Sequence, residues 1–132
     1  MIDIQLIDLA AHCQAIGCGP PVKTDLSNGG VLVQVAGVKV EGWNRPTADL
    51  LFVAPPGYPA GQPDCFWVEP SNFRLANGNT PQNANDANPI PGEVLPERTT
   101  TWFSWHVQSW NPSRDTLTTY FKVILNRLAT AQ

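Results

Sequence analysis

The sequence has few charged residues and no excess of positive charge. Charged residues make up 14% of the chain, against about 25% in an ordinary soluble domain. Eight Lys and Arg oppose eleven Asp and Glu, which gives a formal net charge of −3. This balance lacks the basic surface that nucleic acids require and the polybasic patch that anionic membranes attract. We therefore expect neither a nucleic acid nor a membrane as a partner.

Long apolar runs and an N-terminal targeting signal are also missing. No run approaches the ~20 apolar residues of a membrane-spanning helix, and no basic region precedes the first apolar stretch. The 132 residues, 42% of them hydrophobic, are enough to bury a core without disulfide or metal staples. We expect a single domain over residues 1–132, located in the cytoplasm.

Cysteine is sparse, and its count is odd. The three cysteines are Cys13, Cys18 and Cys65, a set that fits a reducing cytosol better than a secreted scaffold. His12 stands beside Cys13, so zinc ligation is one interpretation, but four ligands at recognisable spacing are absent. We favour small buried side chains, and we predict no metal site and no cofactor.

Short strands and two flanking helices are indicated by the pattern of apolar residues. Thirteen prolines and ten glycines punctuate short apolar runs, as they do between strands. A helix is predicted over 2–16, ended by Gly17 and the prolines that follow. Its stripe is Ile2, Leu6, Leu9, Cys13 and Ile16.

The middle of the chain predicts an antiparallel meander of about four strands. Every connection between the apolar runs is too short for a crossover helix. The expected strands lie at 31–35, 38–41 (after a break at Gly37), 48–54 and 65–68, with a short strand or extended lead-in at 22–26.

A long polar stretch and a second helix complete the predicted chain. Residues 76–100 read as a loop, which at this length is either functional or floppy. A helix is expected over about 112–129, capped by Asn111, with Arg127 placed favourably near its C-terminal end. Its buried stripe is Leu117, Tyr120, Phe121, Ile124 and Leu128.

The first candidate for function is the corner over residues 55–59. Consecutive prolines fix the direction in which the chain leaves the preceding strand. They hold Tyr58 at a rigid position with a hydroxyl that needs a partner. Tyr58 is a binding candidate, and a stiff turn without function is the alternative.

Aromatic residues crowd the segment before the last helix. Three tryptophans within nine positions are too many for one helical stripe, so we treat Trp102, Trp105 and Trp110 as binding candidates. The alternative is that they cover the open end of the sheet. His106 can shuttle a proton near neutral pH. Ser104 and Cys65 become its partners only if the fold brings them together.

The order of these elements, with the corner at 55–59, resembles the ubiquitin-conjugating fold. More narrowly, the chain is similar to the prokaryotic ubiquitin-conjugating family E. The resemblance implies an α+β, UBC-like fold with an N-terminal helix, a four-stranded antiparallel meander, an irregular active-site segment and a C-terminal helix. It covers nearly the whole chain, on the matching stretches 50–59, 63–70, 102–106, 110–112 and 115–120.

The chain departs from the ubiquitin-conjugating pattern at the active site. Those enzymes carry His-Pro-Asn before the reactive cysteine, whereas this chain has Glu69-Pro70-Ser71-Asn72. The following stretch, residues 73–81, contains no cysteine. Cys65 is the one cysteine nearby, and burial in an apolar strand would raise its pKa and leave it inert. His106 falls where the bacterial branch also keeps a histidine.

Three functional hypotheses follow from these residues. The leading one is a conjugating-enzyme-like protein that forms no thioester and binds a ubiquitin-like protein or its activating enzyme, through the sheet, the N-terminal helix or the tryptophan-rich end. The second is an active enzyme with Cys65 as nucleophile and His106 as its assistant. The third is a β-sheet module that binds a peptide or carbohydrate through Trp102, Trp105 and Trp110.

Overall fold

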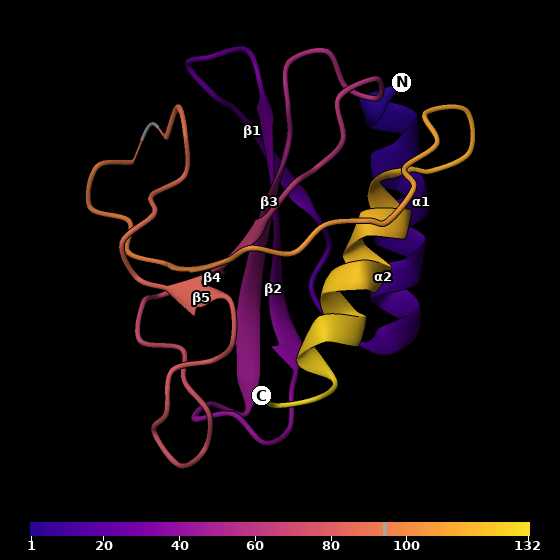
Figure 1. Cartoon of the computed structure of the whole chain (residues 1–132). Helices are drawn as coiled ribbons and strands as arrows, with labels where there is room; N and C mark the ends of the chain where they lie inside the picture. The colour runs from indigo at the N-terminus through magenta and orange to yellow at the C-terminus, as the bar shows by residue number, and fades with distance from the viewer. Residues whose placement is uncertain (94) are drawn as a thin grey trace.

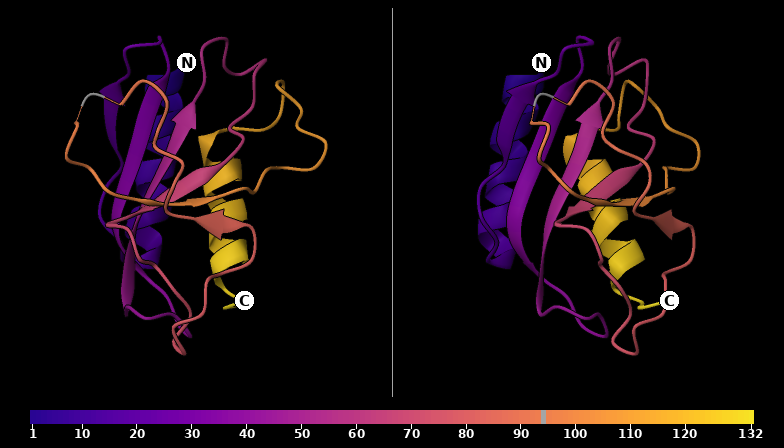
Figure 2. Two further views of the ribbon diagram at one scale, coloured as in Figure 1. Left: turned by 60° about the vertical axis from the view of Figure 1, so that its left-hand side comes forward. Right: turned by 90° about the vertical axis from the view of Figure 1, so that its left-hand side faces the viewer.

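The computed structural model describes residues 1–93 and 95–132. Both helices cover one face of a single sheet, and a long loop lies on the other side (Figure 1; Figure 2). Helix α1 spans Ile2–Ile16 and α2 spans Leu117–Leu128. Within the described residues, neither helix is long and apolar enough to cross a membrane. The strands are β1 (Val22–Asp25), β2 (Val31–Lys39), β3 (Thr47–Ala54), β4 (Phe66–Glu69), β5 (Ala84–Asn85) and β6 (Thr101–Phe103).

The described chain forms a sheet of six strands rather than four, in the order β1-β2-β3-β4-β6-β5. The first four strands follow one another in an antiparallel meander, although the two strands predicted at 31–35 and 38–41 are one strand, β2. Two short strands then extend it, because β6 returns to pair with β4 and β5 pairs with β6. Runs of two and three residues carry too little alternation to be recognised as strands in a sequence.

Gly37 does not divide β2 into two strands. The chain passes through Gly37 with φ of 73°, a conformation that glycine adopts without a steric penalty. The pairing with β3 shifts there, between Val35 and Val38. The Gly37 N–H donates to the Asp49 carboxylate at 2.9 Å instead of to the ladder. A bulge therefore replaces the predicted break.

The sheet separates two apolar cores. Side chains alternate between its faces along every strand. The helix-side core lies under α1 and α2, and its largest fully buried members are Leu9, Leu50, Phe52, Phe66, Phe73, Phe103, Leu117, Tyr120, Phe121 and Ile124. The loop-side core lies on the opposite face, and its buried members are Leu26, Leu32, Leu51, Trp67 and Ile90.

The long stretch at 76–100 is ordered by its contacts with the loop-side core. Ile90 is 4% exposed there, and the Trp67 indole N–H donates to the Asn88 carbonyl at 2.8 Å. Arg98 pairs with the Glu69 carboxylate at 3.0 Å, which ties the stretch to the end of β4. Residue 94 lies outside the described residues. In the described part, these contacts argue against a floppy loop, while a function for the stretch stays a prediction.

Helix α2 begins five residues later than predicted, and its N-cap is Thr116 rather than Asn111. The Asn111 side chain instead accepts from the Ser113 N–H, in a turn before the helix. At the true start, Thr116 Oγ1 accepts from the Thr119 N–H and Thr119 Oγ1 accepts from the Thr116 N–H. This reciprocal capping box satisfies two donors that a helix start otherwise leaves unpaired.

Replacing Thr116 with alanine removes half of this capping box. We expect Thr116→Ala to lower the free energy of unfolding by about 1 kcal/mol, as is typical for loss of an N-cap. Urea denaturation measures the change, with Ser113→Ala in the exposed preceding turn as the matched control. An unchanged free energy of unfolding in Thr116→Ala would contradict the assignment of the cap.

Candidate functional site

The corner after β3 is a joint between three elements. The Tyr58 hydroxyl donates to the Gln5 side-chain oxygen on α1. The same oxygen accepts from the Leu117 N–H at the start of α2, at 3.0 Å. Burial raises the pKa of Tyr58 to about 12. The hydroxyl is thus already engaged inside the molecule, which favours a structural role for Tyr58.

Trp110 belongs to the same joint. Its indole N–H donates to the Pro59 carbonyl at 2.8 Å, and its ring lies 6.0 Å from the ring of Tyr58. The segment between β6 and α2 is thereby attached to the corner. Tyr58 and Trp110, which the sequence offered as binding residues, meet each other within the fold.

The three tryptophans do not form one surface. Trp102 packs against the loop-side core, whereas Trp105 packs against the helix-side core on the other face of the sheet. Trp110 lies at the corner with Tyr58. A flat aromatic platform for a peptide or carbohydrate needs rings that face the same way. This geometry therefore gives no support to the third hypothesis.

The pairing of β4 with β6 brings both predicted catalytic residues to one end of the sheet. Phe66 lies opposite Phe103. Continuing this register by one residue places Cys65 opposite Ser104. Just beyond the strands, His106 Nδ1 lies 3.8 Å from the Asp64 carboxylate, and both side chains are largely exposed. An imidazole beside a carboxylate is an arrangement suited to accepting and donating protons.

Cys65 itself is half-buried and packs with the loop-side core. Burial raises the pKa of its thiol, and a hydrogen bond with Trp102 offsets only part of that rise. A raised pKa reduces the fraction of thiolate, which is the reactive form. The prediction that its apolar surroundings would raise the pKa of Cys65 is thus confirmed.

A small pocket opens beside His106. It has a volume of about 300 Å³ and is lined by Asn83, Ser104, Trp105, His106 and Gln108. The Ser104 N–H donates to the Asn83 carbonyl at 2.9 Å, which joins two of these lining residues where β5 begins and β6 ends. Cys65 is not among the lining residues. The fold therefore joins His106 to Ser104 in one pocket and leaves the thiol outside it.

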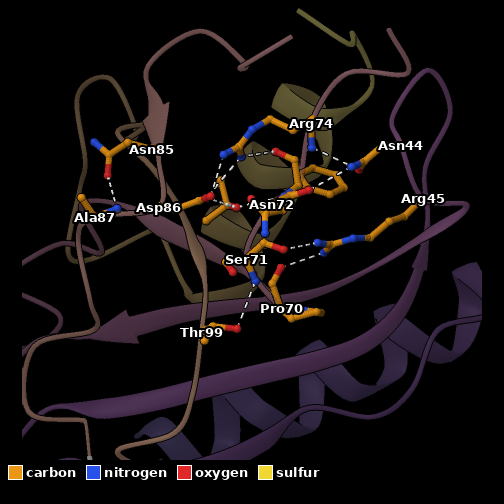
Figure 3. A network of polar contacts seen from close by, with 12 residues as sticks. Asn44, Arg45, Pro70, Ser71, Asn72, Arg74, Asn85, Asp86, Ala87 and Thr99 are labelled. Carbon is orange, nitrogen blue, oxygen red and sulfur yellow. Dashed lines mark hydrogen bonds and ion pairs between the residues drawn. The ribbon is translucent and has the colours of Figure 1, made fainter. Parts of the chain in front are cut away.

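The segment after β4, where the ubiquitin-conjugating pattern places its active site, is held by a network of polar contacts (Figure 3). The Arg45 guanidinium donates to the carbonyls of Pro70 and Ser71. The Asn44 side chain donates to the Asn72 carbonyl at 2.9 Å and accepts from the Arg74 N–H at 3.1 Å. The loop between β2 and β3 thus clamps this segment from one side.

An ion pair between Arg74 and Asp86 clamps the segment from the other side. The two guanidinium N–H groups donate to the two carboxylate oxygens at 3.2 and 2.6 Å. The Thr101 hydroxyl donates to the same carboxylate at 2.6 Å. Sequence reasoning missed this pair because both residues lie in polar stretches without a pattern. The described residues contain no group of three or more His, Cys, Asp or Glu side chains placed to hold a metal.

Comparison with known proteins gives one match. Residues 21–131 match the model of the family described as Prokaryotic E2 family E. No curated protein and no solved structure matches the chain.

The Arg74–Asp86 pair makes the stability of this segment depend on pH. Burial alone would raise the pKa of Asp86, but the hydrogen bonds from Arg74 and Thr101 prevail and lower it. A lowered carboxyl pKa contributes stability above the unfolded value of about 3.9, and that stability is lost as pH falls through the folded value. We expect Asp86→Asn to reduce the free energy of unfolding at pH 7 by about 1–3 kcal/mol.

Urea denaturation at several pH values measures this dependence. The difference between wild type and Asp86→Asn should shrink as the pH falls below about 4, because the wild-type carboxyl then also becomes neutral. Asp25→Asn, at an exposed position at the end of β1, controls for the loss of one negative charge. A difference that stays constant down to acidic pH would contradict the role of the ionised carboxylate.

Proposed function

Because the chain belongs to the prokaryotic E2 family E, we propose that this ubiquitin-conjugating-like protein acts in a bacterial ubiquitin-like modification system by binding, without forming the usual thioester. Its partner is a ubiquitin-like protein or the enzyme that activates it. The observation that carries the proposal is the segment after β4. It contains no cysteine through residue 81, and Asn44, Arg45 and Asp86 hold it in place.

Rigidity without a nucleophile favours a role in binding. A thioester requires a thiolate, and hydroxyl or amide groups do not replace it with comparable ease. The half-buried Cys65 thiol has a raised pKa. A fold that is retained while its reactive group is missing can still present the surfaces that partners recognise.

The outer face of α1 is the surface best suited to a protein partner. Leu9 and Cys13 face the core, yet Ile4 and Ile7 are 73% and 72% exposed on the other side. Ala11 continues this outer face one helical turn later. A helix with apolar anchors at this spacing is the form that docks into a hydrophobic groove.

The charged residues of α1 indicate which charge would suit the rim of a partner's groove. These residues are Asp3 and Asp8, and Asp8 lies toward α2, where its carboxylate accepts from the Thr118 hydroxyl at 2.8 Å. Asp3 pairs with Lys23 at 3.2 Å, but its side chain remains 80% exposed. A partner groove with a basic rim would complement this helix, and such complementarity raises the rate of association.

Substituting the two exposed isoleucines tests the α1 surface. We expect the double variant Ile4→Glu, Ile7→Glu to weaken binding by at least about tenfold, because the few residues at the centre of a protein interface carry most of the binding energy and two buried charges would replace them. Calorimetry with purified ubiquitin-like and activating-type proteins from the same source as this chain measures the affinity.

Leu95→Glu is the matched control, since Leu95 is also a large exposed apolar residue but lies in the stretch that covers the opposite face. The control should bind as the wild type does. If neither protein binds the wild type, the proposed function is wrong. If the Ile4→Glu, Ile7→Glu variant binds as tightly as the Leu95→Glu control, the assignment of the binding surface to α1 is wrong.

An active enzyme with Cys65 as nucleophile is the second candidate, favoured by the contact between Asp64 and His106 next to that cysteine. In this case, incubation with activating enzyme, ATP and ubiquitin-like protein should give an adduct that reductant cleaves. Non-reducing electrophoresis detects it. The adduct should disappear in Cys65→Ala and persist in Cys18→Ala. An adduct that persists in Cys65→Ala, or no adduct at all, would remove this candidate.

A further inference from the structure

Two cysteines meet where α1 ends, and the proposed function uses neither of them. The helix closes with Gly17 in the left-handed conformation, at φ 82°. The Cys18 N–H then donates back to the Cys13 carbonyl at 3.1 Å, and the Gly17 N–H donates to the Gln14 carbonyl at 3.3 Å. These two bonds define a Schellman ending. In this motif the side chains at the two positions that Cys13 and Cys18 occupy here are commonly in contact.

Both contacting side chains here are thiols. Cys18 Sγ donates to the Cys13 carbonyl at 3.6 Å, and the Cys18 side chain packs against the core cluster that contains Cys13. A disulfide requires the two backbones to lie close and the two Cβ atoms to point toward one another. The Schellman bonds bring the two backbones together, and this kind of helix ending commonly places the side chains at these two positions side by side.

The two thiols differ in their access to solvent. Cys13 is fully buried, and burial together with the neighbouring thiol raises its pKa to about 12. Cys18 is half-buried. It lines a cleft of about 410 Å³ with Ile16 and Val38, and another of about 460 Å³ with Ile7 and Pro20. A small oxidant therefore reaches Cys18 and not Cys13.

We propose that Cys13 and Cys18 form a reversible oxidative modification site, in which a peroxide converts the two thiols to an intramolecular disulfide. The Cys18 thiolate attacks one peroxide oxygen, so that an S–O bond forms, the O–O bond breaks and hydroxide leaves as water. The Cys13 sulfur then attacks the sulfenic sulfur. The S–S bond forms, the S–O bond breaks, and the hydroxyl leaves with the Cys13 proton as a second water.

Proximity makes the second step possible although Cys13 is a weak nucleophile. The helix ending already holds Cys18 against Cys13, and such fixed proximity can replace a high concentration of a reactant. The product joins the residues on either side of Gly17 and locks the end of α1. The inference concerns this helix end alone and does not depend on the proposed function.

Peptide mapping of the full-length protein tests the site directly. The chain is treated with hydrogen peroxide, alkylated without reductant and digested with trypsin, which releases residues 1–23 as one peptide because Lys23 is the first Lys or Arg. We expect this peptide to lose two hydrogen atoms and to resist alkylation at Cys13 and Cys18. Dithiothreitol should restore both thiols, while Cys65 in another peptide reports the general level of oxidation.

Two variants distinguish the mechanism from non-specific oxidation. Cys18→Ser, at the half-buried position, should leave Cys13 reduced and its peptide unchanged in mass. Cys13→Ser should leave Cys18 as a sulfenic acid that dimedone traps. Accumulation of sulfinic acid at Cys18 in the wild type, or a disulfide between two molecules instead of within one, would overturn the proposal.

Discussion

The pairing of β4 with β6 is the constraint on which the rest of this structure depends. Phe66 stacks on Phe103 with ring centroids 4.7 Å apart and planes 6° from parallel. The neighbouring pair, Trp67 and Trp102, points to the opposite face. Because side chains alternate along a strand, a slip of one residue would exchange the two faces. The register that fills both cores also sets Cys65 against Ser104 and brings Asp64 to His106.

A buried cation completes the helix-side core at the far end of α2. Arg127 is 4% exposed, and its guanidinium lies 5.2 Å from the ring centroids of both Phe103 and Trp105. It donates to the carbonyls of Gln82, Thr130 and Gln132. Burial lowers its pKa, but aromatic faces and carbonyl oxygens together stabilise the charge. Through these contacts Arg127 fixes Trp105 at the wall of the small pocket.

The sequence predicts those features whose signal is local and repeated. Helix α1 follows its prediction at both ends, because a long apolar stripe is followed by Gly17. Strands β3 and β4 also carry enough apolar residues to be recognised. Strands β5 and β6 do not, since two or three residues pair there only because β4 offers an edge. The role of Arg127 was also hidden, because its position near a helix end suggested only a favourable interaction with the dipole.

The sequence offered candidate site residues but not their arrangement in space. The sequence identified Cys65, His106, Tyr58 and the tryptophans by their chemistry. The fold decides which of them meet, and this depends on contacts between distant segments. Tyr58 and Trp110 lie together at the corner after β3, and His106 and Ser104 lie together just beyond the end of β6. The ion pair between Arg74 and Asp86 could not be predicted from the sequence, because a single pair of charged residues forms no repeating pattern.

The surroundings of Cys65 make a catalytic role more costly in free energy than a binding role. The outer face of α1 is exposed already, so a partner can dock there without a change in the fold. Cys65 packs with Trp102 on the loop-side face, whereas His106 and Asp64 lie in solvent. For Cys65 to react as a thiolate, it must lose its proton against a raised pKa. A partner can supply that difference by binding the thiolate form more tightly than the thiol form. The catalytic candidate therefore asks more of a bound partner than docking on α1 does.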